Sequence, residues 1–185
     1  NAKVDVLLHE QSADIAQGVE EALGASTSYT GVSMRLRQYA PLGHRLVFAQ
    51  RIAVQQTDGP VPLFDLATMQ TVSGQAEALG GSGSVRGVAK NRFVGKGVAF
   101  YNHELRYRLS DFMLMGKSAY SVVSAFVDAG RVWDDRIRAD ELLRDLHAGY
   151  GGGLRLGLGP SFLVAFDIGR SSESTQIYIG HGYPY

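Results

Sequence analysis

The sequence predicts an all-β fold, an antiparallel transmembrane β-barrel with about eight strands. Apolar and polar residues alternate in several segments, which is the period of a strand with two different faces. Hydrophobic residues make up 45% of the chain yet rarely cluster, as such strands require. No stretch approaches the roughly 18 uninterrupted apolar residues of a spanning helix, so any membrane insertion has to use strands.

Length favours a single unit, residues 1–185, and the charge balance indicates neither nucleic acid nor anionic lipid as a partner. The 18 basic and 18 acidic residues cancel, so no overall attraction to nucleic acid is expected. The absence of cysteine removes disulfides and thiolate metal sites and is compatible with an oxidising compartment. The chain starts at Asn1 without a secretory signal, which indicates a processed protein or a fragment.

Three strands are predicted in the first third of the chain. They are Lys3–Gln11, Thr30–Tyr39 and Arg45–Gln56. The second is typical, because Met34 and Leu36 alternate with Arg35 and Arg37. Between the first two strands, Ser12–Gly24 has apolar residues at helical spacing and is predicted to form a short helix, in a loop or packed on a partner.

A long connection, residues 58–97, separates the third and fourth strands. Connections of this length are usually functional or disordered. It contains a glycine-rich run with Gly80, Gly81 and Gly83, followed by Arg86 and Gly87. No Gly-Lys-Ser/Thr follows at phosphate-loop spacing, so nucleotide binding is not indicated. A flexible surface turn and a loop folded back into a barrel stay open as alternatives.

Five further strands are predicted downstream. They are Val98–Leu109, Ser121–Trp133, Gly149–Gly157, Phe162–Gly169 and Thr175–Tyr183. A short helix is predicted at Arg138–His147.

Two acids on these strands, Glu104 and Asp128, lie where they could meet Arg86 through charge-assisted, bidentate bonds. Gly130 shares a face with Asp128 and leaves space for an incoming loop. Alternatively, these acids, with Arg106 and Arg108, only solvate a polar lumen or pair among themselves.

The C-terminal residues provide a second indication of an outer-membrane barrel. Ile177, Ile179, Tyr183 and the final Tyr185 follow one another on one face, and this end resembles the assembly signal of many outer-membrane barrels. Aromatic residues near strand ends, including Trp133 and Tyr150, suit either an interfacial girdle or a core.

Enzyme chemistry is not indicated. The five histidines show no paired metal spacing, and the glycine-rich run lacks the final glycine of a nucleophile elbow. We therefore expect no catalytic residue, no metal site and no cofactor.

Three motifs resemble the Omp85 or bacterial surface antigen D15 family of outer-membrane barrels. They are Val85-Arg86-Gly87-Val88, Asn102-His103-Glu104-Leu105-Arg106-Tyr107 and Phe126-Val127-Asp128-Ala129-Gly130-Arg131-Val132-Trp133. The family has an aromatic residue where Val88 stands. The resemblance implies that Arg86 turns into the lumen and pairs with Asp128 and Glu104. It also implies that the chain is the C-terminal portion of a barrel, either half of a sixteen-stranded one or a small member that closes with eight strands.

By this resemblance, the protein lies in the bacterial outer membrane and assists insertion or translocation of polypeptides, with the Gly80–Gly97 loop as a gate or plug. Its partners would be the lipid bilayer, polypeptide clients, and N-terminal periplasmic domains or an oligomer partner. One alternative is a non-transporting anchor barrel of a longer surface protein or patatin-like lipase. Another is a soluble ligand-binding β-barrel, whose apolar side chains would point inward.

Overall fold

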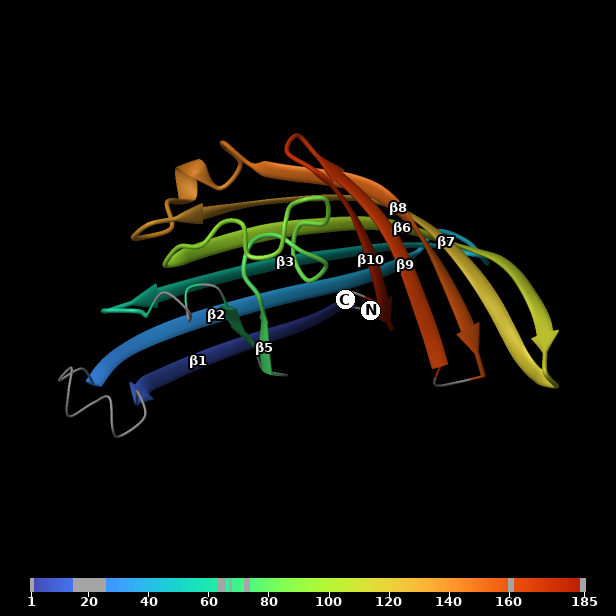
Figure 1. Cartoon of the computed structure of the whole chain (residues 1–185), viewed down its shortest axis with the longest axis horizontal. Helices are drawn as coiled ribbons and strands as arrows, with labels where there is room; N and C mark the ends of the chain where they lie inside the picture. The colour runs from blue at the N-terminus through green and yellow to red at the C-terminus, as the bar shows by residue number, and fades with distance from the viewer. Residues whose placement is uncertain are drawn as a thin grey trace.

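A computed structural model describes residues 2–14, 26–62, 66, 68–71, 74–159 and 162–183. Its main feature is one curved antiparallel sheet, in which each strand pairs with its neighbour in the chain except where β3 pairs with β6 (Figure 1). The strands, in order across the sheet, are β1 (Ala2–Asp14), β2 (Ser26–Pro41), β3 (Leu46–Asp58), β6 (Gly97–Leu114), β7 (Lys117–Trp133), β8 (His147–Leu158), β9 (Phe162–Ser171) and β10 (Thr175–His181).

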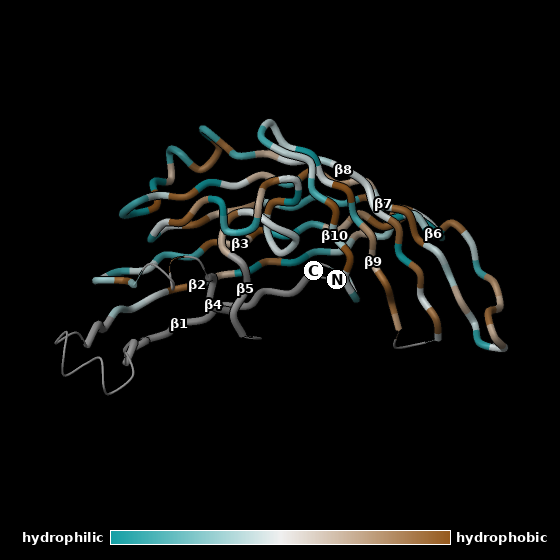
Figure 2. The backbone as a smooth tube through the Cα atoms, in the orientation of Figure 1, coloured by the Kyte–Doolittle hydropathy of each residue, from teal (hydrophilic) through white to brown (hydrophobic). Residues whose placement is uncertain are grey.

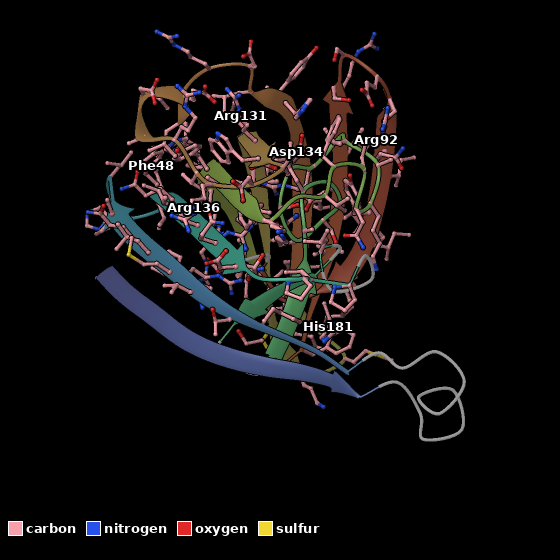
Figure 3. The ribbon with its side chains drawn as sticks, turned by 90° about the vertical axis from the view of Figure 1, so that its left-hand side faces the viewer. Phe48, Arg92, Arg131, Asp134, Arg136 and His181 are labelled. Atoms are coloured by element: carbon pink, nitrogen blue, oxygen red, sulfur yellow. The ribbon has the colours of Figure 1, made fainter. Side chains whose placement is uncertain are left out.

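The connection between β3 and β6 lies on one side of this sheet. It includes a small hairpin of β4 (Thr68–Thr71) and β5 (Gly74–Glu77), followed by an irregular segment, residues 78–96. We call residues 78–96 the inner loop, because the sheet curves around it in the view of Figure 3. The side of the sheet that it covers is called the loop face, and the opposite side the outer face.

The all-β, antiparallel prediction is confirmed. Each of the eight segments predicted as strands overlaps one strand of the sheet, because a period of two is a local signal that pairing then extends. In the strand order β1 and β10 are the two edges, and the described residues do not pair them. Closure into a barrel and the total number of strands therefore stay predictions.

The two predicted helices are not found where residues are described. Ser12–Asp14 belong to β1 and pair with Ser26–Ser28 of β2, while residues 15–24 of the first predicted helix lie outside the described residues. In the second, only a short 3₁₀ turn, Ala139–Glu141, forms.

Bonds to β7 explain why Arg138–His147 does not continue as a helix. Arg131 donates to the Arg144 carbonyl at 3.0 Å and to the Glu141 carboxylate at 2.8 Å, and Trp133 donates to the same carboxylate at 3.2 Å. Trp133 is thereby buried rather than placed in a girdle. No helix among the described residues has the length and hydrophobicity to cross a membrane.

The two faces of the sheet differ in the predicted way, and hydropathy alternates along the strands in Figure 2. Large apolar side chains are exposed on the outer face. They include Val32, Met34, Leu105, Tyr107, Val127, Tyr150, Leu154, Leu156, Phe166, Ile168, Ile177 and Ile179. Charged side chains on the loop face, in contrast, are buried beneath the inner loop.

A small apolar core joins the inner loop to the sheet. It consists of Leu79, Val85 and Val88 from the loop with Ala53, Val98 and Phe100 from β3 and β6. Val88, which stands where the resembling family has an aromatic residue, is 2% exposed and fills this core. The inner loop is thus packed against the sheet as part of the fold.

Candidate functional site

Glycines shape the inner loop where it turns onto the sheet. Gly80, Gly81 and Gly87 have φ values of 107°, 105° and 94°, which glycine adopts far more readily than other residues. A Cβ on Gly80 would also lie 2.0 Å from the Ala89 carbonyl oxygen. Gly83 has a different role, since its carbonyl accepts a hydrogen bond of 2.7 Å from Arg51.

Arg86 is the centre of the site. Its guanidinium donates to both carboxylate oxygens of Asp128, from Nε at 2.7 Å and from Nη2 at 3.1 Å. Its Nη1 donates to Glu104 Oε2 at 2.9 Å, and its backbone N–H donates to Asp128 at 3.1 Å. The ring of Phe126 lies 3.5 Å from the guanidinium carbon. The sequence-predicted residues Arg86, Glu104 and Asp128 are therefore brought together.

All three of these residues are shielded from solvent. Arg86 and Glu104 are 1% exposed and Asp128 is 0% exposed. Burying a charge is costly unless it is paired and hydrogen-bonded, and a bidentate arginine–carboxylate pair meets both needs. The position of the inner loop is thus specified by bonds that only one docked geometry satisfies.

Three more charged residues extend the site. Arg155 of β8 makes a bidentate pair with Asp167 of β9 at 2.6 and 2.9 Å, and Arg106 donates to Glu104 at 2.9 Å. Asp167 also lies 3.5 Å from Arg86, and Arg155 lies 3.8 Å from Glu104. We call these six residues, Arg86, Glu104, Arg106, Asp128, Arg155 and Asp167, the charge cluster. Its three arginines balance its three acids.

The alternative that the strand charges pair among themselves holds in part. Arg106 does pair with Glu104. Arg108 instead pairs with Asp111 near the end of the strand, where both side chains are about half exposed. A register shift between Arg108 and Ser110 accompanies this departure from the predicted polar face.

Glycines on the strands let the backbone of the inner loop approach closely. A Cβ on Gly149 would lie 1.9 Å from the Arg86 carbonyl oxygen, and one on Gly169 would lie 2.7 Å from the Gly87 nitrogen. A Cβ on Gly130 would lie 2.4 Å from Leu79 Cδ1, so this predicted space is used by the loop. Side-chain size at these positions decides whether the loop can dock.

Further bonds fix the segment before Arg86. Asn102 of β6 donates to the Ser84 carbonyl at 2.5 Å and accepts from Arg51 Nε at 2.9 Å. The Gly80 N–H donates to the Ser84 hydroxyl at 2.9 Å. Sequence reasoning did not identify Arg51, Ser84, Arg155 and Asp167 as members of the site.

The C-terminal residues divide between the two faces. Ile177 and Ile179 are 71% and 73% exposed on the outer face, as predicted. Tyr183 does not continue that face, since its ring lies 4.3 Å from the guanidinium carbon of Arg106. The reason is that β10 ends at His181 and Gly182 has a φ of 79°, which breaks the alternation. Tyr185 lies outside the described residues.

Tyr183 is partly buried beside the charge cluster. Burial raises the pKa of Tyr183, although Arg106 acts in the opposite direction. An aromatic ring thus lies against the charge cluster, within cation–π distance of Arg106.

The arrangement holds the inner loop in place against β6 and β7. A family model described as the Omp85 superfamily domain matches residues 10–182. No curated protein and no solved structure matches the chain.

Proposed function

The chain belongs to the Omp85 superfamily, whose members are outer-membrane proteins involved in insertion or transport, and from this premise we propose that it assists polypeptides into or across the bacterial outer membrane. Within this role, the inner loop is a gate or plug on the inside of a barrel wall. The observation that carries the proposal is the buried bidentate contact between Arg86 and Asp128.

The outer face supports a lipid environment for the sheet. Its exposed leucines, isoleucines, valines and aromatic residues would be costly in water but are suited to the hydrocarbon of a bilayer. Most strands reach or exceed the roughly 9–11 residues that a tilted strand needs to cross. The loop face then lines the lumen, in agreement with its buried charges.

The charge cluster supports a loop that takes one defined position. Buried ion pairs often contribute more to the choice of one arrangement than to stability. Removal of the inner loop would take Arg86 away from Asp128 and Glu104 and would leave Asp128 without its bidentate partner, so the docked position is strongly favoured. A movable plug needs such a preferred state, from which a client or an attached domain could displace it.

The experiment compares full-length protein carrying Arg86→Ala with the wild type in planar bilayers and in vesicles. We expect a change in single-channel conductance or in open fraction, together with reduced insertion of a test β-barrel polypeptide into the vesicles. Arg108→Ala is the matched control, because the half-exposed Arg108 guanidinium pairs with Asp111 and lies over the Tyr120 ring, neither of which belongs to the inner loop.

Two results would argue against the proposal. Unchanged conductance and unchanged insertion in correctly folded Arg86→Ala protein would show that the inner loop is not a gate. Wild-type protein that neither conducts nor promotes insertion would instead indicate a membrane anchor for a longer surface protein, the second role compatible with this architecture.

A further inference from the structure

Strand β10 contacts the inner loop at Gly87 and Val88, the two residues that follow Arg86. The backbone N–H of Gly87 donates to the hydroxyl oxygen of Tyr178 at 2.9 Å. The same hydroxyl donates to the Val88 carbonyl at 3.4 Å. Tyr178 reaches the loop face because it alternates with Ile177 and Ile179, which are exposed on the outer face.

The turn between β9 and β10 holds the other polar group of Gly87. The Gly87 carbonyl oxygen accepts hydrogen bonds from the Ser171 hydroxyl at 2.9 Å and from the Ser174 hydroxyl at 2.7 Å. The N–H of Ser174 also lies 3.2 Å from the Ser171 hydroxyl oxygen, so the two serines are fixed relative to each other. Both backbone polar groups of Gly87 are therefore satisfied by the last hairpin: by Tyr178 of β10, by Ser171 at the end of β9 and by Ser174 in the turn between them.

Close backbone approach makes these bonds possible. A Cβ on Gly87 would lie 2.6 Å from the Arg170 carbonyl carbon, and one on Gly169 would lie 2.7 Å from the Gly87 nitrogen. The motif glycine thus has a defined function, which is to bring the loop backbone within hydrogen-bonding distance of the last hairpin.

β10 is an edge strand of the described sheet. Its ladder runs to β9 alone, from Thr175 to His181. An edge strand that has one neighbour exchanges more readily with solvent than a central strand does. Bonds from the inner loop to Tyr178 and Ser174 supply a second attachment, on the loop face rather than along the strand edge.

We propose that Tyr178, Ser171 and Ser174 are positioning residues that couple the docked inner loop to the order of β10. With the loop docked, β10 stays paired to β9, and withdrawal of the loop loosens β10. The coupling is a free energy between two segments, so it acts in both directions: a change in β10 also loosens the loop. The inference concerns conformation and does not depend on what the protein transports.

Hydrogen exchange of the full-length protein in vesicles tests this coupling. Tyr178→Phe removes the hydroxyl and keeps the ring, and we expect β10 amides to exchange roughly fivefold faster, the factor for one net hydrogen bond. Arg86→Ala should accelerate the same amides, although the acids that its guanidinium contacts, Asp128, Glu104 and Asp167, lie on β7, β6 and β9 rather than on β10. Tyr150→Phe is the matched control, because this tyrosine is exposed on the outer face.

The effect of β10 on the inner loop can be measured with a spin label, because the chain has no cysteine that would compete for labelling. Ser82→Cys, at an exposed position of the inner loop, provides the attachment point for a spin label that reports on the loop. Tyr178→Phe and the pair Ser171→Ala with Ser174→Ala should each increase its mobility, whereas Tyr150→Phe should leave it unchanged.

Three outcomes would overturn the proposal. The first is unchanged β10 exchange in Tyr178→Phe or in folded Arg86→Ala protein. The second is equal acceleration of β6, β7 and β10, which indicates general destabilisation. The third is an unchanged Ser82 label in both variants. If Arg86→Ala does not fold, Tyr178→Phe and the serine variants decide alone, because each removes only hydroxyl groups.

Discussion

Asp128 accepts three hydrogen bonds from Arg86, two from the Arg86 guanidinium and one from the Arg86 backbone N–H. One strand carboxylate therefore fixes both the side chain and the backbone of a residue that lies far away in sequence. Because Asp128 is fully buried, this contact is lost only when the inner loop leaves the sheet or the pair is mutated.

Removal of one partner should be costly. Arg86→Ala leaves the buried Asp128 without its bidentate partner and leaves Glu104 with Arg106 alone at hydrogen-bonding distance, so we expect a loss of about 3–5 kcal/mol in the free energy of unfolding. Urea unfolding in vesicles, monitored by tryptophan fluorescence of Trp133, measures it. The control is Arg92→Ala, whose pair with Glu173 is about half exposed and should contribute below about 1 kcal/mol. Equal effects of both variants would contradict this reading.

Lysine at position 86 should not replace arginine in holding the inner loop. Arg86→Lys keeps the charge but lacks the planar fork that binds both oxygens of Asp128. We expect Arg86→Lys to resemble Arg86→Ala in loop mobility, measured with the spin label at position 82. Full rescue by lysine would show that only charge matters.

Side-chain size on β8 should control docking of the loop. Gly149→Ala places a Cβ 1.9 Å from the Arg86 carbonyl oxygen, so the loop has to shift outward. Limited proteolysis of residues 78–96 should become faster in this variant. Gly180→Ala is the control, because a Cβ there meets nothing within 4 Å. A protease-resistant loop in Gly149→Ala protein would be inconsistent with the structure.

A charged side chain introduced on the outer face should lower the stability of the protein in lipid. Val127 is 55% exposed in the middle of β7, and Val127→Lys should cost about 2–4 kcal/mol near the bilayer midplane. Unfolding from vesicles measures this cost. Ser172→Lys, in the exposed β9–β10 turn, should change stability little. If both lysine variants were equally stable, the outer face would not be in hydrocarbon.

Strands and faces were predictable, because alternation is visible within a few residues. Met34 and Leu36 against Arg35 and Arg37 indicate a strand with two faces before any partner is known. The two helix predictions failed for a non-local reason. Ser12–Asp14 pair with β2 as part of strand β1. Hydrogen bonds from Arg131 and Trp133 to Glu141 hold the second segment in a non-helical form.

The site was predictable only where a motif named its members. The family resemblance led to Arg86, Glu104 and Asp128, and the structure brings these three together. Arg155 and Asp167 lie in the same cluster through cross-strand register, which a single sequence does not display. Tyr178 was missed for the same reason, since its partner Gly87 is 91 residues away.

The double-mutant cycle between Arg86→Ala and Asp128→Ala, measured by unfolding from lipid vesicles, tests the central claim most directly. We predict strong coupling, about 2–3 kcal/mol, because each single change removes the same buried contact. Additive effects, with coupling below about 0.5 kcal/mol, would show that the two residues do not meet in the membrane-embedded protein and would contradict the account.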